Sequence, residues 1–266
     1  MFISHKYKVI FVHIQRTGGS SIHRAFQKCD PDLVETLPVH SAAKRTKHSF
    51  ITDIKHTVEH DIFQNYLKFC VVRNPFDRMV SWYHMVIGKK GDDQAMFKIR
   101  DKNKRLNIFF KGIKFLNNAN LPLKKNLLNY WTQLFLLIEK SDNKFAIQAA
   151  KSGTDTALEL KKKSKNFKEF IFSTQNPEDV FFKKFRLNQL DYISDKTHIL
   201  VDKILRFENL NAEFNNLGKK IAFEGALSQI NKSADRKSYE SYYDDRTKKM
   251  ILKRFKKDFE HFGYHF

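Results

Sequence analysis

The sequence predicts an α/β fold with a parallel sheet, and two similar stretches of chain carry this prediction. In the first, the β-branched and aromatic run 9–12 precedes a short loop and an apolar stripe at helical spacing. In the second, the apolar run 69–72 precedes Arg73, and Pro75 is favourable in the first turn of a helix. A buried strand, a turn and a helix, in this order, are typical of a parallel sheet flanked by helices.

The loop between the first strand and its helix has the composition of an anion-binding turn. Its residues are Gln15, Arg16, Thr17, Gly18, Gly19, Ser20 and Ser21. Glycines let the backbone approach a ligand closely, and N–H groups at the start of a helix point toward it. The loop therefore favours a phosphate or sulfate site, although a Gly-Gly pair is also compatible with a tight structural turn.

The second turn supplies a cation in a similar position. Arg73 follows its strand directly, and open parallel sheets bind ligands at the carboxyl ends of their strands. A guanidinium can hold a phosphate through two parallel hydrogen bonds, and Ser81, two turns along, can donate to the same group. The Walker pattern GxxxxGK followed by Ser or Thr is absent, so an ordinary nucleotide triphosphatase is not supported.

Composition indicates a globular, strongly basic protein. Of the 266 residues, 41% are apolar and 26 are Phe, which excludes a disordered chain. Lys and Arg total 49 against 29 acidic residues, a formal net charge of +20. This charge favours polyanionic partners such as nucleic acid, anionic glycans, phosphorylated cofactors or acidic lipid surfaces, and it does not choose among them.

The cysteines and the apolar runs indicate the cellular compartment. Cys29 and Cys70 cannot form a disulfide framework, and we expect both to be small buried hydrophobes. No secretory signal precedes the first strand, and no apolar run is long enough to span a bilayer. We therefore expect a soluble, cytoplasmic protein.

The rest of the chain predicts one domain over residues 1–266. Residues 88–165 are rich in lysine and helical in pattern, and we interpret them as an insertion. We expect further elements as follows: helices at 50–66 and 189–193, a strand within 199–207, a helix from about residue 211, a basic loop at 229–236, and a final helix at 247–262.

The two turns together resemble motifs of the carbohydrate sulfotransferases. Residues 13–21 (HIQRTGGSS) closely resemble their 5′-phosphosulfate loop, usually HIPKTGGTS, and residues 71–83 look like their 3′-phosphate motif, VRNPxDRxxSxY. The order, spacing and strand–loop–helix context of both motifs agree. Residues 206–210 (RFENL), 231–233 (NKS) and 258–264 (DFEHFGY) also look like the C-terminal part of the family. The resemblance covers residues 7–87 and 167–266 and leaves the middle of the chain unmatched.

The resemblance implies a P-loop-like α/β fold and the donor 3′-phosphoadenosine 5′-phosphosulfate. Residues 15–21 would hold the 5′ end of this donor, Arg73 and Ser81 its 3′-phosphate, and Ser233 would close over it. The sulfuryl group would pass by in-line displacement to a hydroxyl of a carbohydrate acceptor, a glycan or a glycolipid. Positioned cations such as Arg16 can stabilise the leaving oxygen, so no metal is required in principle.

The acceptor hydroxyl needs a general base, and His40 is the candidate. Its context, Val-His-Ser-Ala-Ala, resembles a short histidine-containing segment between the two motifs of the family. A lone loop histidine is also compatible with a surface role. His13 is interpreted as structural, and His48, His56 and His60 are alternative candidates for the base. Glu208 could instead be a structural partner of Arg206. The family has Lys where this chain has Arg16, and arginine supports charge but is poor at donating a proton.

Two other functions are weighed against the sulfotransferase. A P-loop nucleotide-dependent kinase would require magnesium and a Walker lysine, which the sequence lacks. A basic nucleic-acid-binding protein would account for the charge, but the organised basic residues stand at strand ends, so we expect no nucleic-acid partner. The identity of the acceptor and the oligomeric state stay open.

Overall fold

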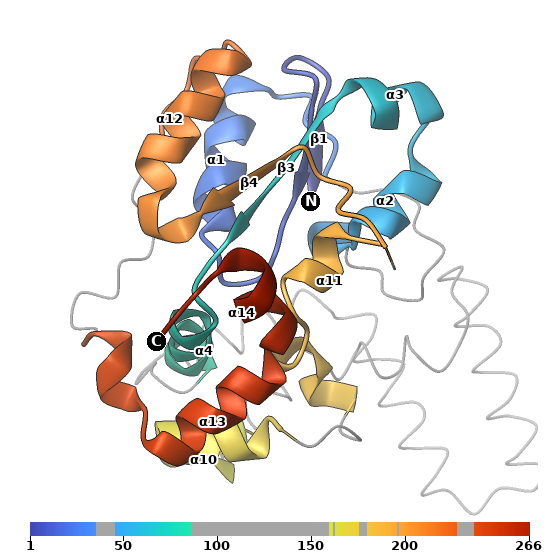
Figure 1. Cartoon of the computed structure of the whole chain (residues 1–266). Coiled ribbons are helices and arrows are strands. Elements are labelled where there is room, and N and C mark those ends of the chain that lie inside the picture. The colour runs from blue at the N-terminus through green and yellow to red at the C-terminus, as the bar shows by residue number, and fades with distance from the viewer. Residues whose placement is uncertain (36–45, 87–159, 162, 176–179, 196, 228–236) are drawn as a thin grey trace, which may run out of the picture.

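The computed structural model describes residues 1–35, 46–86, 160–161, 163–175, 180–195, 197–227 and 237–266 (Figure 1). In these ranges the chain forms a four-stranded sheet, ordered β1 (Phe2–Ser4), β2 (Val9–Val12), β3 (Leu67–Val72) and β4 (Lys203–Arg206). The strands β2, β3 and β4 are parallel, with Val12 opposite Cys70 and Val72 opposite Arg206. The predicted α/β fold with a mostly parallel sheet flanked by helices is confirmed.

The edge strand β1 is the part of the sheet that the sequence did not predict. It runs antiparallel to β2, with Phe2 opposite Phe11 and Ser4 opposite Val9. Three residues are too few to establish an alternating pattern. The polar residues His5 and Lys6 that follow give no signal of a hairpin between β1 and β2.

One face of the sheet is covered by α1 (Gly19–Cys29) and α12 (Leu210–Lys220), which lie side by side in Figure 1. The apolar side chains that meet there come from both helices and all four strands. They include Phe2, Phe11, Ile22, Phe26, Phe69, Val71, Leu205, Phe214 and Leu217. The apolar stripe of the first helix therefore faces the sheet as its spacing predicts.

The opposite face is covered by four short helices, α2 (Ile51–Thr57), α3 (His60–Asn65), α11 (Leu190–Ile193) and α14 (Lys256–Phe262). The buried side chains of this layer include Ile10, Val12, Ile54, Phe63, Cys70, Val72, Ile193 and Phe262. Cys70 is fully buried, as expected, whereas Cys29 is only partly buried.

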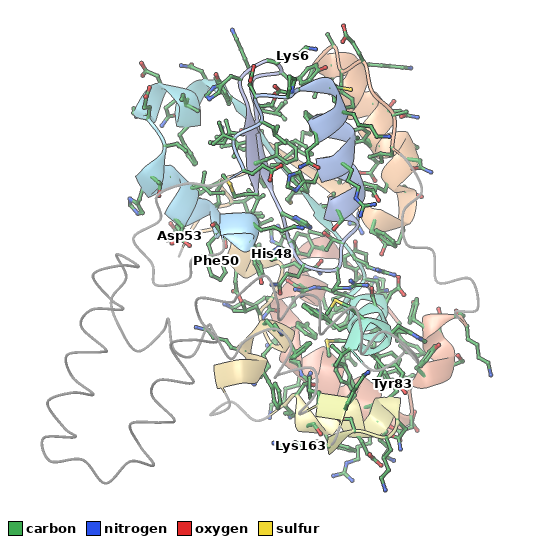
Figure 2. All side chains as sticks on the ribbon, turned by 180° about the vertical axis from the view of Figure 1, so that it is seen from behind. Lys6, His48, Phe50, Asp53, Tyr83 and Lys163 are labelled. Carbon is green, nitrogen blue, oxygen red and sulfur yellow. The ribbon has the colours of Figure 1, made fainter. Side chains whose placement is uncertain are left out.

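A third core lies beyond the carboxyl ends of the strands, where α4 (Pro75–Val86) packs with α10 (Phe167–Ser173), η2 (Val180–Phe185) and α13 (Asp245–Arg254). We call it the α4 cluster, and its buried residues include Phe76, Trp82, Phe170, Phe185, Ile251 and Phe255. Figure 2 shows Tyr83 and Lys163 in this part of the molecule, at the opposite end from Lys6.

Several predicted elements differ from the observed ones at their boundaries. The helix expected at 50–66 is broken at Val58 and Glu59, where both residues leave helical geometry. The final helix expected at 247–262 is two helices that meet at Phe255. Most of the predicted insertion at 88–165 lies outside the described residues. Among the residues described, no helix combines the length and apolarity needed to cross a membrane.

A buried polar link ties the last helix to the turn after β3. Asp258, on α14, is fully buried and accepts hydrogen bonds from the backbone of Gln189 (2.9 Å) and Leu190 (3.0 Å). The Gln189 side chain then accepts from the Arg73 backbone N–H and donates to the Arg73 carbonyl, both at 2.8 Å. One amide side chain thus satisfies both backbone groups of Arg73, which has left the sheet.

Replacing that amide by a carboxylate tests the link. We expect Gln189→Glu to lower the free energy of unfolding by about 1–3 kcal/mol, because the donor to the Arg73 carbonyl is lost and two oxygens then face each other. Urea denaturation would measure this change. Gln175→Glu makes the same chemical change at an exposed position and serves as the control. Equal destabilisation in both variants would contradict the assigned role.

Candidate active site

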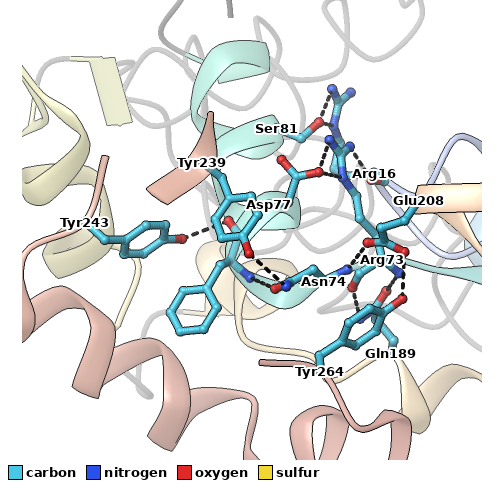
Figure 3. A network of polar contacts seen from close by, with 11 residues as sticks. Arg16, Arg73, Asn74, Asp77, Ser81, Gln189, Glu208, Tyr239, Tyr243 and Tyr264 are labelled. Atoms are coloured by element: carbon cyan, nitrogen blue, oxygen red, sulfur yellow. Dashed lines mark hydrogen bonds and ion pairs between the residues drawn. The ribbon is translucent and has the colours of Figure 1, made fainter. Parts of the chain in front are cut away.

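The three parallel strands end at one edge of the sheet, and the turns that follow them contact one another. β2 leads into the loop 13–18, β3 into Arg73, and β4 into η3 (Phe207–Asn209). Arg73 Nη1 donates a hydrogen bond to the carbonyl oxygen of Arg16 at 3.1 Å, which joins the first two turns (Figure 3). The Phe207 ring of the third turn stacks on the Arg73 guanidinium, with Cζ 3.9 Å from the ring centroid.

The first loop has the backbone of an anion-binding turn. Arg16 (φ 67°) and Gly18 (φ 86°) are left-handed, and Thr17 between them is not. Such alternation directs successive N–H groups toward one side, where they form a concavity for an anion. A Cβ atom added at Gly19 would lie only 2.3 Å from Cδ2 of His13. Glycine at this position therefore allows the loop to pack tightly against the histidine ring.

Helix α1 begins at this loop and contributes its positive end. Gly18 is the N-cap and has no side chain to cap the helix, and the first turn carries no acidic residue. The first N–H groups of a helix have no partner within it, and the helix dipole favours negative charge there. The predicted donor-binding residues of the loop that are partly exposed are Gln15, Arg16, Gly18, Ser20 and Ser21.

Arg16 and Ser81 connect the loop to helix α4. The buried Ser81 hydroxyl accepts hydrogen bonds from Nε (3.0 Å) and Nη2 (2.8 Å) of Arg16. The loop 15–21 and the second motif are therefore joined by a contact between side chains, Arg16 to Ser81, in addition to the bond from Arg73 to the Arg16 carbonyl. In this structure the Ser81 hydroxyl faces Arg16, whereas the sequence paired it with Arg73.

Arg73 is held from several sides at the head of α4. The residue is only 6% exposed, and its Nε and Nη2 both lie 2.6 Å from Oδ2 of Asp77. Burial lowers the pKa of Arg73 to about 10, and the negative charge of Glu208 opposes this shift. The guanidinium thus keeps its charge at neutral pH in a place from which water is largely excluded.

Glu208 closes the site from the side of the C-terminal tail. Its two carboxylate oxygens accept from the Asn74 backbone N–H (2.7 Å) and from the Tyr264 hydroxyl (3.0 Å). Its interpretation as a partner of Arg206 is wrong, because Arg206 donates instead to the carbonyl of Phe262 at 2.6 Å. Glu208 and Tyr264 are 56 residues apart, so no local sequence pattern predicts that they pair.

Two predicted site residues cannot be compared with the structure. His40, the candidate base, and Ser233, the candidate lid residue, lie outside the described residues. Among the described histidines, His48 donates a hydrogen bond from Nδ1 to the carbonyl oxygen of His13 at 2.8 Å.

The match to known protein families extends over nearly the whole chain. Residues 1–265 match the family model described as Sulfotransferase family. The chain belongs to the sulfotransferase family. Searches among curated proteins and among solved structures gave no match. Membership supports sulfuryl transfer in general terms and confirms, at this level, the resemblance carried by the two motifs.

The residues to which sequence reasoning gave no role in this sulfotransferase are the supports of the site. They are Asn74, Arg78, Gln189, Asp258 and Tyr264, with Asp77 assigned only to the helix dipole. Asn74, Asp77 and Arg78 stand inside the second motif, so their proximity to Arg73 was a signal. The partners of Gln189 and Asp258 are set by tertiary packing alone.

His13 gives the sulfotransferase a stability that depends on pH. The residue is 3% exposed, and burial, reinforced by His48, lowers its pKa well below the ordinary value of 6.5. The unfolded chain binds a proton near pH 6.5 and the folded chain does not, so stability falls as the pH decreases below 6.5. One such residue contributes a slope of up to about 1.4 kcal/mol per pH unit.

We therefore expect His13→Gln to lose less stability than the wild type between pH 7.5 and pH 5.5. Urea denaturation at both pH values would measure the difference. His23 and His84, whose pKa values are also lowered by burial, are present in both proteins and cancel. The control is His56→Gln at an exposed position. If the pH dependence is the same for His13→Gln and wild type, the assignment is wrong.

Proposed function

We propose that this protein transfers a sulfuryl group from 3′-phosphoadenosine 5′-phosphosulfate to a hydroxyl of a carbohydrate acceptor. The observation that carries the proposal is the contact between the two turns, the 3.1 Å hydrogen bond from Arg73 to the Arg16 carbonyl. It brings a bare helix N-terminus and two arginines to one edge of the sheet. A donor with phosphate groups on the 3′ and 5′ oxygens of one ribose needs two anion sites in such proximity.

The loop residues fit the 5′ end of this donor. The left-handed Arg16 and Gly18 and the uncapped start of α1 supply backbone donors, and Thr17, Gly19, Ser20 and Ser21 complete the loop. Thr17 is structural in part, because its hydroxyl donates to the Ile14 carbonyl at 3.0 Å. Gln15 precedes the left-handed pair and is partly exposed.

Arg73 and Ser81 are our candidates for the 3′-phosphate. The contacts of Arg73 with Asp77 and with the Arg16 carbonyl use three of the five guanidinium N–H groups. The remaining two can donate to phosphate oxygens while Asp77 keeps the group in place. Ser233 is proposed to close over the donor.

The transfer is an in-line displacement at sulfur. The acceptor oxygen forms a bond to sulfur while the bond from sulfur to the bridging oxygen of the 5′-phosphate breaks, and adenosine 3′,5′-bisphosphate leaves. The negative charge that develops on the bridging oxygen is stabilised by Arg16 and the loop N–H groups. The hydroxyl proton passes to a base, for which His40 is the candidate.

Arg16 performs the role of the family lysine by charge and by geometry. Ser81 fixes its guanidinium through two hydrogen bonds, which a lysine ammonium cannot reproduce with the same fork. A permanently charged group needs no proton transfer to support a phosphate leaving group. Loss of the acid step is therefore compatible with transfer.

Binding of the product tests the donor assignment. We expect calorimetry to detect adenosine 3′,5′-bisphosphate binding in the presence of EDTA and to find it weakened about tenfold or more in Arg73→Ala, because a charge-assisted contact is lost. Arg246→Ala removes an exposed arginine of α13 and serves as the control. Unchanged binding in Arg73→Ala, or binding of ATP with Mg²⁺ alone, would contradict the proposal.

Transfer itself tests the base. Screening glycans and glycolipids with labelled donor would first identify an acceptor. With that acceptor we expect His40→Ala to reduce turnover by about 10²-fold or more, since general-base catalysis contributes this much, while product affinity is retained. His261→Ala, at an exposed position of α14, is the control. Full turnover in His40→Ala would remove the residue from the mechanism.

A further inference from the structure

Arg78 is a charged side chain buried beneath the active site, and the function proposed above gives it no role. It lies on α4, one turn after Asn74, and is only 1% exposed. Burial lowers its pKa below the usual arginine value. Among the described residues no carboxylate lies within ion-pair distance of its guanidinium. The carboxylates of Asp258 and Asp191 favour its charge from beyond contact distance, so burying this cation is compensated only in part.

The contacts of Arg78 lead directly to the 5′ loop. Its Nε donates to the carbonyl oxygen of Gln15 and its Nη1 to that of Leu187, both at 3.0 Å. Gln15 immediately precedes Arg16, the left-handed residue of the loop. The third nitrogen, Nη2, is buried and has no hydrogen-bond partner among the residues that the structure describes.

The planarity of the peptide bond converts this contact into an orientation. The carbonyl of Gln15 and the N–H of Arg16 belong to one rigid plane and point in opposite directions. A carbonyl held by Arg78 beneath the loop therefore turns the Arg16 N–H toward the other side. Arg73 acts in the same way on the next plane, because it holds the Arg16 carbonyl and thereby orients the Thr17 N–H.

We propose that Arg78 is a positioning residue for the 5′ phosphosulfate end of the donor. It holds the Gln15–Arg16 peptide so that its N–H faces the anion, and it places a second fixed positive charge beneath the loop. The two arginines of the second motif thus set two successive peptide planes of the first. This inference rests on the proposed function. It adds that Arg78 supports binding of the 5′ group of the donor and does not affect binding of the 3′-phosphate.

A pair of ligands separates this role from a merely structural one. Adenosine 3′,5′-bisphosphate carries the 5′ group and adenosine 3′-phosphate lacks it. We expect Arg78→Met to bind the bisphosphate about tenfold more weakly or worse than wild type, measured by calorimetry with EDTA. Its affinity for adenosine 3′-phosphate should stay within about twofold. General loosening of the fold would lower the affinities for both ligands by the same factor.

Arg254 offers a matched control in the α4 cluster. It is an arginine of α13 that donates to the Ile171 carbonyl (2.8 Å) and to the Thr174 hydroxyl (3.1 Å), and burial lowers its pKa to about 10. Arg254→Met therefore removes a similar group at a site away from the loop. We expect it to change the affinities for the two ligands by the same factor.

The outcomes separate the inference from the function on which it rests. If wild type binds both ligands and Arg78→Met lowers both affinities equally or neither of them, the inference is overturned. The proposed donor site is then unaffected. If wild type does not bind the bisphosphate, both the inference about Arg78 and the proposed function are rejected. Should Arg78→Met fail to fold, Arg78→Lys carries the test, because an ammonium keeps the charge but cannot fork between two carbonyls. A selective loss of bisphosphate affinity supports the proposal, and an unselective one overturns it.

Discussion

The hydrogen bond from the Arg73 guanidinium to the Arg16 carbonyl is the contact on which the site depends, because it joins two turns that are 57 residues apart in the chain. It forms because β2 and β3 are parallel neighbours whose register sets Val12 opposite Cys70, so both strands deliver their turns to the same edge. A shift of one residue in this register would turn the buried strand residues to the wrong face of the sheet. The packing of both sheet faces thus fixes the geometry of a polar site that lies outside the core.

Where strands give way to turns, backbone groups lose their partners in the sheet, and side chains replace them. Gln189 satisfies both backbone groups of Arg73, and Glu208 satisfies the Asn74 N–H. These supports come from α11, from η3 and, through Asp258, from the last helix. The C-terminal part of the chain therefore maintains the N-terminal turns, which gives a physical reason for the family match to extend over residues 1–265.

The site also concentrates positive charge in a place that water hardly reaches. Burial lowers the pKa values of Arg73 and Arg78, which means that each cation is less stable there than in water. Of these two arginines, Arg73 alone has a carboxylate, that of Asp77, within contact distance in the described part of the chain. Acidic groups offset part of this cost, Glu208 for Arg73 and Asp258 and Asp191 for Arg78.

The sequence alone determined the two strand–turn–helix units, because apolar strand residues and glycines in a turn are local patterns. It also predicted the loop 15–21, Arg73 and Ser81 as site residues, since small residues in a turn and a cation at a strand end are local patterns too. The spacing within each motif also predicted a sulfotransferase, and the match over residues 1–265 confirms this at the level of the sulfotransferase family. Tertiary structure decided that Ser81 contacts Arg16, that Glu208 binds Asn74 and Tyr264, and that Arg78 supports Gln15. Those contacts join residues brought together by strand register and helix packing, so no local stretch of sequence records them.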